Sequence, residues 1–314
     1  MTSTAVAPAK VILFGEHFVV HGTSAVLCAI DMLVQVAVTS LEDDILQIES
    51  KVGSCKTMIS NGKVTDTLGP LAYIARKISK KSGHSGGMHI IVNSHIPSGA
   101  GLGSSSACCV AATCATIGLF SECTKEDIVE IALQAERTMF VNASGADSAA
   151  SAYGGVLCFN IESGFKKLRS SANLSLLVAN SGIQRSTDNV VSGVGEFRAN
   201  NVDRFEKLCQ NESKLISKAI PAVMEGDLEK IGEYFGENQS YLEEIGVSNN
   251  TLDKMIKITD EYGYGSKITG AGGGGCIISA VPIEKQKEAI EALTDAGYVS
   301  HTVNIDHFGA RMIH

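Results

Sequence analysis

A glycine- and serine-rich segment at residues 97–106, with the sequence PSGAGLGSSS, constrains the fold of this chain more than any other feature. Residues 88–94 before it are typical of a strand, and the apolar stretch from about 106 to 120 predicts a buried helix. Glycines lack a Cβ, so backbone amides can approach an anion, and a helix N-terminus adds about half a positive charge. The segment predicts a phosphate-binding loop, with a flexible turn as the alternative. It is neither a Walker A sequence nor a Rossmann fingerprint.

A second glycine-rich run occupies residues 269–276, with the sequence TGAGGGGC. It is flanked directly by Ile268 and by Ile277 and Ile278, which are strand-forming residues. A linker is the alternative, but tight apolar flanks favour a loop whose backbone closely approaches another loop or a ligand.

A lysine stands at the start of an apolar strand in residues 7–17, APAKVILFGEH. Lys10 is either a solvated strand end or a buried ammonium group, and a buried one requires an anionic partner. His17 and His21 are four residues apart, but without an H-E-x-x-H context they do not predict a metal site.

Two carboxylates stand out in the middle of the chain. Glu136 borders the apolar face of a helix that begins near Thr124, where Thr124 and Asp127 resemble a capping box, so we expect Glu136 to point partly inward. Asp147 lies among small residues in NASGADSAA, which predicts a tightly packed loop and helix start. Taken alone, Asp147 is better explained as a helix N-cap.

The order of the predicted elements indicates an α+β protein with two domains. A chain of 314 residues is more often divided into two domains than folded as one. Strands with helices precede residue 170, and helices with a small sheet follow it, so we expect domains at 1–170 and 171–314. Asn61 and Gly62 predict a hairpin turn within residues 43–64.

Charge, apolar runs and cysteines narrow the class of protein. The net charge of −8 disfavours a nucleic-acid partner or an anionic membrane surface. The longest apolar stretch, residues 107–120, is shorter than the roughly 20 residues of a membrane span. The nine cysteines include no C-x-x-C pair, which favours free thiols in a reducing compartment. With no signal-peptide pattern, the expectation is a cytoplasmic protein without membrane contact.

The three segments, in this order, resemble the motifs of the GHMP kinases, a superfamily that includes galactokinase, homoserine kinase, mevalonate kinase and phosphomevalonate kinase. The resemblance covers residues 7–276 and is closest to the mevalonate kinase branch, in its short archaeal or bacterial form. Residues 7–22, with GEH followed by VVHG, look like the first motif of that branch, and residues 136–155 look like its active-site segment. The sequence departs from many relatives at Ala9 and Ala143, neither of which carries chemistry. The family implies an N-terminal domain like ribosomal protein S5 domain 2 and a ferredoxin-like C-terminal domain.

The resemblance also implies an activity, the ATP-dependent phosphorylation of the 5-hydroxyl of mevalonate in isoprenoid precursor synthesis. Asp147 would accept or orient the proton of that hydroxyl, and Lys10 would pair with Asp147 and neutralise charge near the γ-phosphate. Ser105 and Glu136 would ligate Mg²⁺. The implied substrate-binding residues are Glu16, His17, Asp147 and Thr187, the last within an Arg-x-Thr sequence that begins at Arg185. The implied ATP-binding residues are Ser94, Pro97, Ser98, Gly99, Ala100, Gly101, Leu102, Gly103, Ser104 and Ser105.

Other readings stay open at this point. Homoserine kinase, phosphomevalonate kinase and mevalonate 3-kinase are alternatives within the superfamily. A silent nucleotide-binding regulator should have lost Lys10, Glu136 or Asp147, and all three are present. A decarboxylase acting on a diphosphorylated acid is disfavoured by the intact Glu136 and the GEH sequence. A homodimer is suggested by the family alone.

Overall fold

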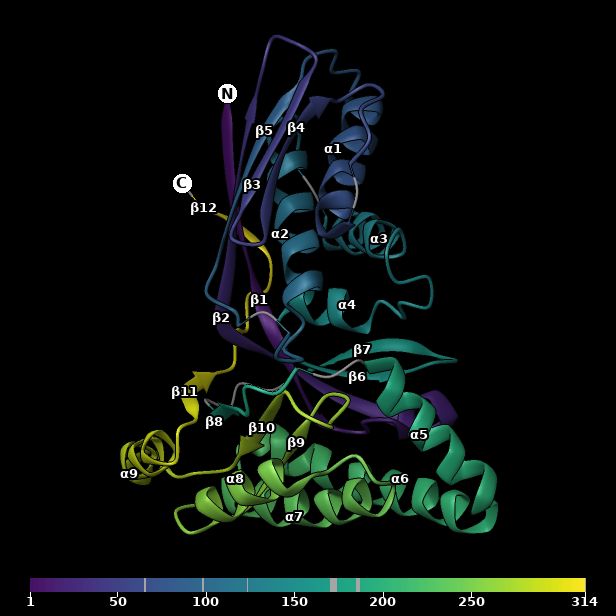
Figure 1. The fold of residues 1–314 in the computed structure, drawn as a ribbon, viewed down its shortest axis with the longest axis vertical. Helices are drawn as coiled ribbons and strands as arrows, with labels where there is room; N and C mark the ends of the chain where they lie inside the picture. Colours follow the sequence, from purple (N-terminus) through teal and green to yellow (C-terminus); the bar gives the residue numbers. More distant parts are fainter. Residues whose placement is uncertain (65, 98, 123, 170–173, 185–186, 314) are drawn as a thin grey trace.

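The structure is a computed structural model that describes residues 1–64, 66–97, 99–122, 124–169, 174–184 and 187–313 (Figure 1). The larger of its two sheets has the strand order β12-β1-β2-β5-β3-β4, with β6 paired to β2 and β7 paired to β6. Its strands are β1 (Thr2–Phe14), β2 (Ser24–Ser40), β3 (Ile45–Ser50), β4 (Gly53–Met58), β5 (Met88–Ser94), β6 (Val156–Asn160), β7 (Gly164–Leu168) and β12 (Arg311–Ile313). The pair β3–β5 is parallel, and the other described pairs are antiparallel.

The long strands β1 and β2 form the spine of the molecule (Figure 1). Strand β2 pairs with β1 along most of its length, with β5 over residues 34–40 and with β6 over residues 24–28. One strand therefore links the helix-covered upper part of the sheet to the lower part, which approaches the second sheet.

Four helices cover one face of this sheet, namely α1 (Gly69–Ser82), α2 (Ser104–Gly118), α3 (Lys125–Glu136) and α4 (Ala146–Tyr153). Helix α2 packs on β1 and β2 and is surrounded by the other three. Its interior is built mostly of alanine, cysteine and threonine, small side chains that allow a helix to approach its neighbours closely. Thr124 caps α3 by accepting a hydrogen bond from the backbone N–H of Asp127, which confirms the predicted helix start.

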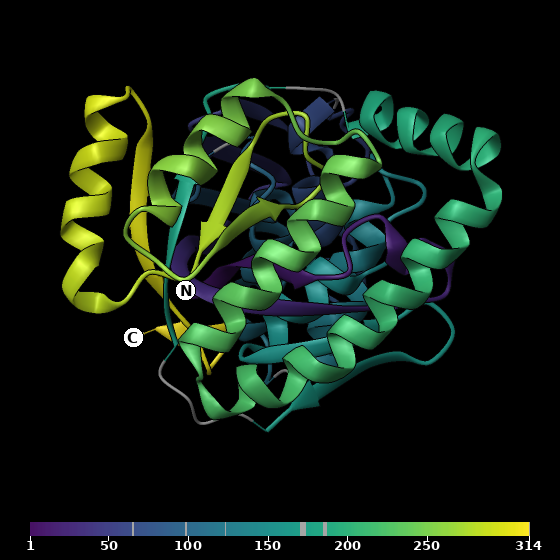
Figure 2. The ribbon, with the colours of Figure 1, turned by 90° about the horizontal axis from the view of Figure 1, so that it is seen from below.

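The smaller sheet has the antiparallel order β11-β8-β10-β9. Its strands are β8 (Ser175–Asn180), β9 (Ser266–Thr269), β10 (Cys276–Ser279) and β11 (Val299–Asn304). The helices of this half are α5 (Thr187–Asn200), α6 (Val202–Glu225), α7 (Leu228–Glu244), α8 (Asn250–Asp260) and α9 (Ile283–Asp295) (Figure 2). Helix α7 packs on α6 and β9, and α8 packs on β9 and β10. The mixed helices and sheets confirm the expected α+β class.

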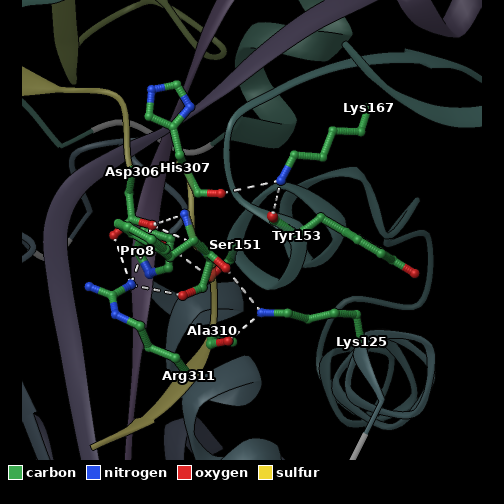
Figure 3. Close-up of polar contacts among 11 residues, drawn as sticks. Pro8, Lys125, Ser151, Tyr153, Lys167, Asp306, His307, Ala310 and Arg311 are labelled. Carbon is green, nitrogen blue, oxygen red and sulfur yellow. Dashed lines mark hydrogen bonds and ion pairs between the residues drawn. The ribbon is translucent and has the colours of Figure 1, made fainter. Parts of the chain in front are cut away.

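After β11 the chain returns to the larger sheet, where β12 pairs with β1 (Figure 1). Three cations hold this return segment (Figure 3). Lys125 donates to the carbonyl oxygens of Phe308 and Ala310, Lys167 donates to that of His307, and Arg311 pairs with Asp306 at 2.9 Å. The segment that leads into β12 is thus held by charged side chains, in addition to the hydrogen bonds between β12 and β1.

The predicted hairpin in residues 43–64 can be compared with the structure, whereas the predicted domain boundary cannot. The hairpin in residues 43–64 exists, and its strands β3 and β4 are joined by a turn at Lys51 and Val52. A turn also follows β4 at residues 59–61, where the backbone N–H of Gly62 donates to the carbonyl oxygen of Met58, so the predicted turn is present but does not join the two strands. The carbonyl oxygen of Gly62 accepts a hydrogen bond from Arg76 of α1. The predicted domain boundary at residue 170 falls outside the described residues and stays a prediction.

The structure also bears on the expectations of free thiols and of no membrane-spanning helix. The described cysteines other than Cys114 are free thiols, and several are buried, as expected for core residues. Among the described helices, none combines the length and apolar character that crossing a bilayer requires.

Candidate active site

A lysine–aspartate pair lies where the larger sheet meets the helices. Lys10 of β1 is 5% exposed, and its Nζ lies 3.2 Å from Asp147 Oδ2. The same Nζ donates to the carbonyl oxygen of Gly101 at 3.1 Å. Gly145 occupies the N-cap of α4 and Asp147 its first turn, so the N-cap alternative for Asp147 does not hold. The buried ammonium has the anionic partner that its position requires.

The glycine- and serine-rich loop wraps around this pair. Gly99, Gly101 and Gly103 have φ of 71°, 78° and 73°, a region that favours glycine. A Cβ on Gly103 would lie 2.9 Å from Lys10 Cγ and 3.6 Å from Asp147 Oδ2, so a larger residue would displace the lysine. The loop ends at the N-terminus of α2, where the helix macrodipole is positive.

The second glycine run lies against this loop. A Cβ on Gly275 would lie 3.2 Å from the carbonyl oxygen of Ala100, and one on Gly270 would lie 3.6 Å from that of Gly101. The Thr269 hydroxyl accepts from the backbone N–H of Ile12 at 2.9 Å and donates to its carbonyl oxygen at 3.0 Å. The run is therefore a close-packed turn that joins the first motif to the loop, and the linker alternative is wrong.

Glu136, the last residue of α3, is 5% exposed and faces inward. Ser106 donates to its Oε1, and Ser148 donates to its Oε2 at 2.7 Å. Burial raises the pKa of Glu136; the two serine hydrogen bonds oppose that shift, and the charge of Asp147 adds to it. Ser105, the predicted metal ligand, is exposed on the first turn of α2 beside Ser106.

The turn after β1 carries the other two predicted substrate contacts. His17 has φ of 60°, the one described non-glycine residue with positive φ, and its Nε2 lies 2.8 Å from the carbonyl oxygen of Ala271. Burial lowers the pKa of His17, which keeps the ring neutral near pH 7. Glu16 is 2% exposed and forms an ion pair with Lys267 of β9. Substrate contact by Glu16 stays a prediction, because in this structure its carboxylate is committed to that pair.

The remaining predicted residues lie at the edges of the site. Ser94 ends β5 and exchanges hydrogen bonds with the backbone of Ile96. Thr187 is the exposed first residue of α5, and among the described hydrogen bonds and ion pairs none joins it to Lys10, Glu136 or Asp147. Ser98 and Arg185 lie outside the described residues.

Four residues of this site were not singled out from the sequence. Ser106 and Ser148 bind Glu136, Lys267 binds Glu16, and Ala271 binds His17. Lys267 had only a weak signal, since its strand has the sequence SKIT, in which Ile268 is the one apolar residue. Ser148 directly follows Asp147, but which side chain it meets depends on the packing of α3 against α4.

The site can hold an anion and a hard cation. The loop amides, the α2 N-terminus and Lys10 suit a polyphosphate, and a carboxylate with hydroxyl neighbours suits Mg²⁺, which takes few protein ligands and keeps waters. In the described part of the chain, no three His, Cys, Asp or Glu side chains gather into a self-sufficient metal site. A pocket of about 590 Å³, lined in part by Gln184, Asn189 and Gly273, adjoins the glycine run.

Comparison with known proteins places these features in a family context. Residues 70–155 match the model of the GHMP kinases N-terminal domain, and residues 219–299 match that of the GHMP kinases C-terminal domain. The chain is 31% identical over 331 aligned residues to a mevalonate kinase from Thermococcus sibiricus, covering 99% of this chain and 98% of that one. It is 35% identical to a mevalonate kinase from Archaeoglobus fulgidus, covering 90% and 93% of the two chains.

Solved structures agree on the fold. The mevalonate kinase of Methanococcus jannaschii superposes with a TM-score of 0.87 at 24% identity, covering 96% of this chain and 98% of that one. The L. major mevalonate kinase in complex with R-mevalonate gives a TM-score of 0.82 at 23% identity, covering 96% and 94%. These structures carry the two-domain fold found here.

Proposed function

Since this chain belongs to the GHMP kinase family, on its mevalonate kinase branch, we propose that it transfers the γ-phosphoryl group of ATP to the 5-hydroxyl of mevalonate. The observation that carries the proposal is the Lys10–Asp147 pair at 3.2 Å, enclosed by the glycine loop at the N-terminus of α2. Phosphoryl transfer needs positioned groups and charge neutralisation more than covalent chemistry, and this site supplies both.

Each part of the site has a role in the proposal. The amides of residues 99–105 hold the ATP phosphates, and Asp147 accepts or orients the proton of the 5-hydroxyl. Lys10 neutralises charge that develops between Asp147 and the transferred group. His17 binds the substrate from the turn after β1, together with Glu16 and Thr187.

Glu136 and Ser105 would hold Mg²⁺, which would neutralise the phosphate oxygens when bound. Ser106 and Ser148 fix the Glu136 carboxylate by hydrogen bonds, which limits its rotation. A homodimer remains a family-based expectation.

A panel of substrates tests the proposed function. The purified protein, with ATP and Mg²⁺, is offered mevalonate, 5-phosphomevalonate, homoserine and galactose, and ADP release is measured. We expect activity with mevalonate, with the phosphate on O5 by ³¹P NMR, and loss of that activity on chelation of Mg²⁺. Phosphate on O3, or a preference for another alcohol, would replace mevalonate 5-kinase by a different kinase of the family.

The close contact at Gly103 gives a second prediction. Gly103→Ala places a methyl group against Lys10 Cγ and is expected to lower kcat/KM at least about 10-fold, a size seen when a reacting group is misplaced by an ångström or less. Gly297→Ala is the matched control, because Gly297 also has positive φ, 88°, but a Cβ there would meet nothing within 4 Å. Both variants should lose about 1 kcal/mol of stability from backbone strain, but only Gly103→Ala should lose activity. Equal activities in the two variants would contradict the tight packing of the loop on Lys10.

A further inference from the structure

Three buried oxygen atoms behind the substrate-side turn lack a hydrogen-bond donor in the described structure. They are Glu16 Oε2, Glu212 Oε1 and Asn238 Oδ1. Glu212 of α6 and Asn238 of α7 are fully buried, and Asn238 Nδ2 donates to Glu212 Oε2 at 2.7 Å. A buried acceptor without a donor costs about 1–3 kcal/mol, so three around one ion pair indicate a missing proton or donor.

The charges around these atoms do not balance if both carboxylates are ionised. Glu16 and Glu212 carry two negative charges, and Lys267, with no exposed surface, supplies one positive charge. Lys10 also acts on Glu16, but its charge is matched by Asp147 at 3.2 Å. The other titratable groups facing Glu212 are Cys209 and Tyr241, and burial raises the pKa of each, so both are neutral near pH 7. Two ionised carboxylates with one ammonium would leave an uncompensated buried charge, which proteins avoid.

A single proton on Glu212 balances the charge and accounts for two of the three oxygen atoms, Glu212 Oε1 and Asn238 Oδ1. A protonated Oε1 is a donor, and its neighbour Asn238 offers Oδ1 as an acceptor while Nδ2 already donates to Oε2. Burial, with the charge of Glu16, raises the pKa of Glu212 from 4.5 to about 8, against the opposing charge of Lys267. With Glu212 neutral, Glu16 is the one carboxylate of this cluster that forms an ion pair with Lys267.

The cluster holds the turn that carries His17. Glu16 is tied to Lys267, and the backbone of Gly15 is a hydrogen-bonding neighbour of Glu212. His17, the proposed substrate contact, follows them directly, and its φ of 60° is sparsely populated and persists only when its surroundings fix it.

We propose that Glu212 is a positioning residue for substrate binding: as a neutral carboxylic acid paired with Asn238, it leaves Lys267 to Glu16 and so fixes the turn at residues 15–17. Ionisation of Glu212 places a second carboxylate beside Lys267, weakens the hold on Glu16 and loosens the turn. The proposal rests on the proposed function only in naming mevalonate as the ligand whose site is positioned.

Steady-state kinetics of the wild type and of Glu212→Gln between pH 7 and pH 9 test this role. Glutamine preserves the shape and the hydrogen-bond pattern of the acid but cannot ionise. In the wild type about one tenth of the molecules keep the proton at pH 9, so KM for mevalonate should rise about 10-fold while KM for ATP does not. Glu212→Gln should match the wild type at pH 7 and show no such rise. Glu233→Gln, the same change at an exposed site on α7, should follow the wild type throughout.

Two further measurements do not depend on the substrate. Because the folded protein keeps a proton that the unfolded chain releases above about pH 4.5, the wild type should lose stability as pH rises to about 8. Melting temperatures should therefore fall less between pH 6 and pH 9 in Glu212→Gln than in the wild type or Glu233→Gln. Amide exchange of residues 15–21, corrected for intrinsic rates, should accelerate at pH 9 in the wild type only.

The outcomes separate the two proposals. A wild type that phosphorylates none of the alcohols overturns the proposed function, and melting and exchange still decide the role of Glu212. A pH response of KM, exchange and melting that is the same in Glu212→Gln as in the wild type, or absent from both, overturns the positioning role.

Discussion

Replacing Asp147 by asparagine is expected to lower kcat about 10³-fold, within the range of 10²–10⁴ typical of a positioned acid–base group. Asparagine keeps the shape of the side chain but cannot accept the proton of the substrate hydroxyl and carries no charge for Lys10. The Kd for ATP, measured by calorimetry, should change little, because the loop amides and the α2 N-terminus remain. Asp147 is partly exposed, so the fold should tolerate the change.

The matched control is Asp203→Asn, which changes an exposed aspartate in the first turn of α6. It should retain the wild-type kcat. Near-normal turnover in Asp147→Asn would remove Asp147 from the chemistry and, with it, the mechanism proposed here.

Lys10→Met should lower kcat about 10²–10³-fold, the range found when one preorganised electrostatic contact is removed. Methionine fills the volume but supplies neither the charge near the γ-phosphate nor the hydrogen bond to Gly101. Because that hydrogen bond shapes the phosphate loop, the Kd for ATP should also rise, which distinguishes this variant from Asp147→Asn. The control is Lys166→Met, which changes an exposed lysine on β7. It should leave both kcat and the Kd for ATP at the wild-type values.

The double variant Lys10→Met/Asp147→Asn tests whether the pair acts as a unit. Residues that act together are strongly non-additive, so the double variant should be about as slow as Asp147→Asn alone. Fully multiplicative losses would indicate that the two side chains act independently despite their 3.2 Å separation.

The parts of the fold that the sequence predicts are those with strong local signals. The capping box at Thr124, the apolar run of α2 and the strand at β5 were all located within a few residues. The turn at Asn61 and Gly62 exists but does not join the strands of the hairpin, because a favourable turn dipeptide does not specify which strands it connects, and the β3–β4 ladder closes at Lys51 and Val52. Strand β12 has only three residues, and its partner β1 lies at the other end of the chain, so no local pattern predicts it.

In the candidate site, too, the sequence predicts some residues, whereas the partners of those residues are known only from the structure. The apolar context predicts that Glu136 points partly inward, and that Lys10 needs an anionic partner only if it is buried, since a solvated strand end was the alternative. The partners of these groups depend on tertiary packing: Ser106 rather than Ser105 contacts Glu136, and Glu16 turns to Lys267. Strand β9 has the sequence SKIT, so little in the sequence marks Lys267 as buried, and its contacts with Glu16 and Phe235 are known only from the structure.

The return of the chain to β1 has a consequence for biosynthesis. The edge of β1 at residues 4–6 is completed by residues 311–313, which are synthesised about 300 residues after β1. Until then the nascent chain exposes an open strand edge, which is a template for wrong pairing with another chain. The two halves therefore cannot be expressed as separate, fully paired folding units, and chaperone dependence should concentrate in the interval before residues 311–313 emerge.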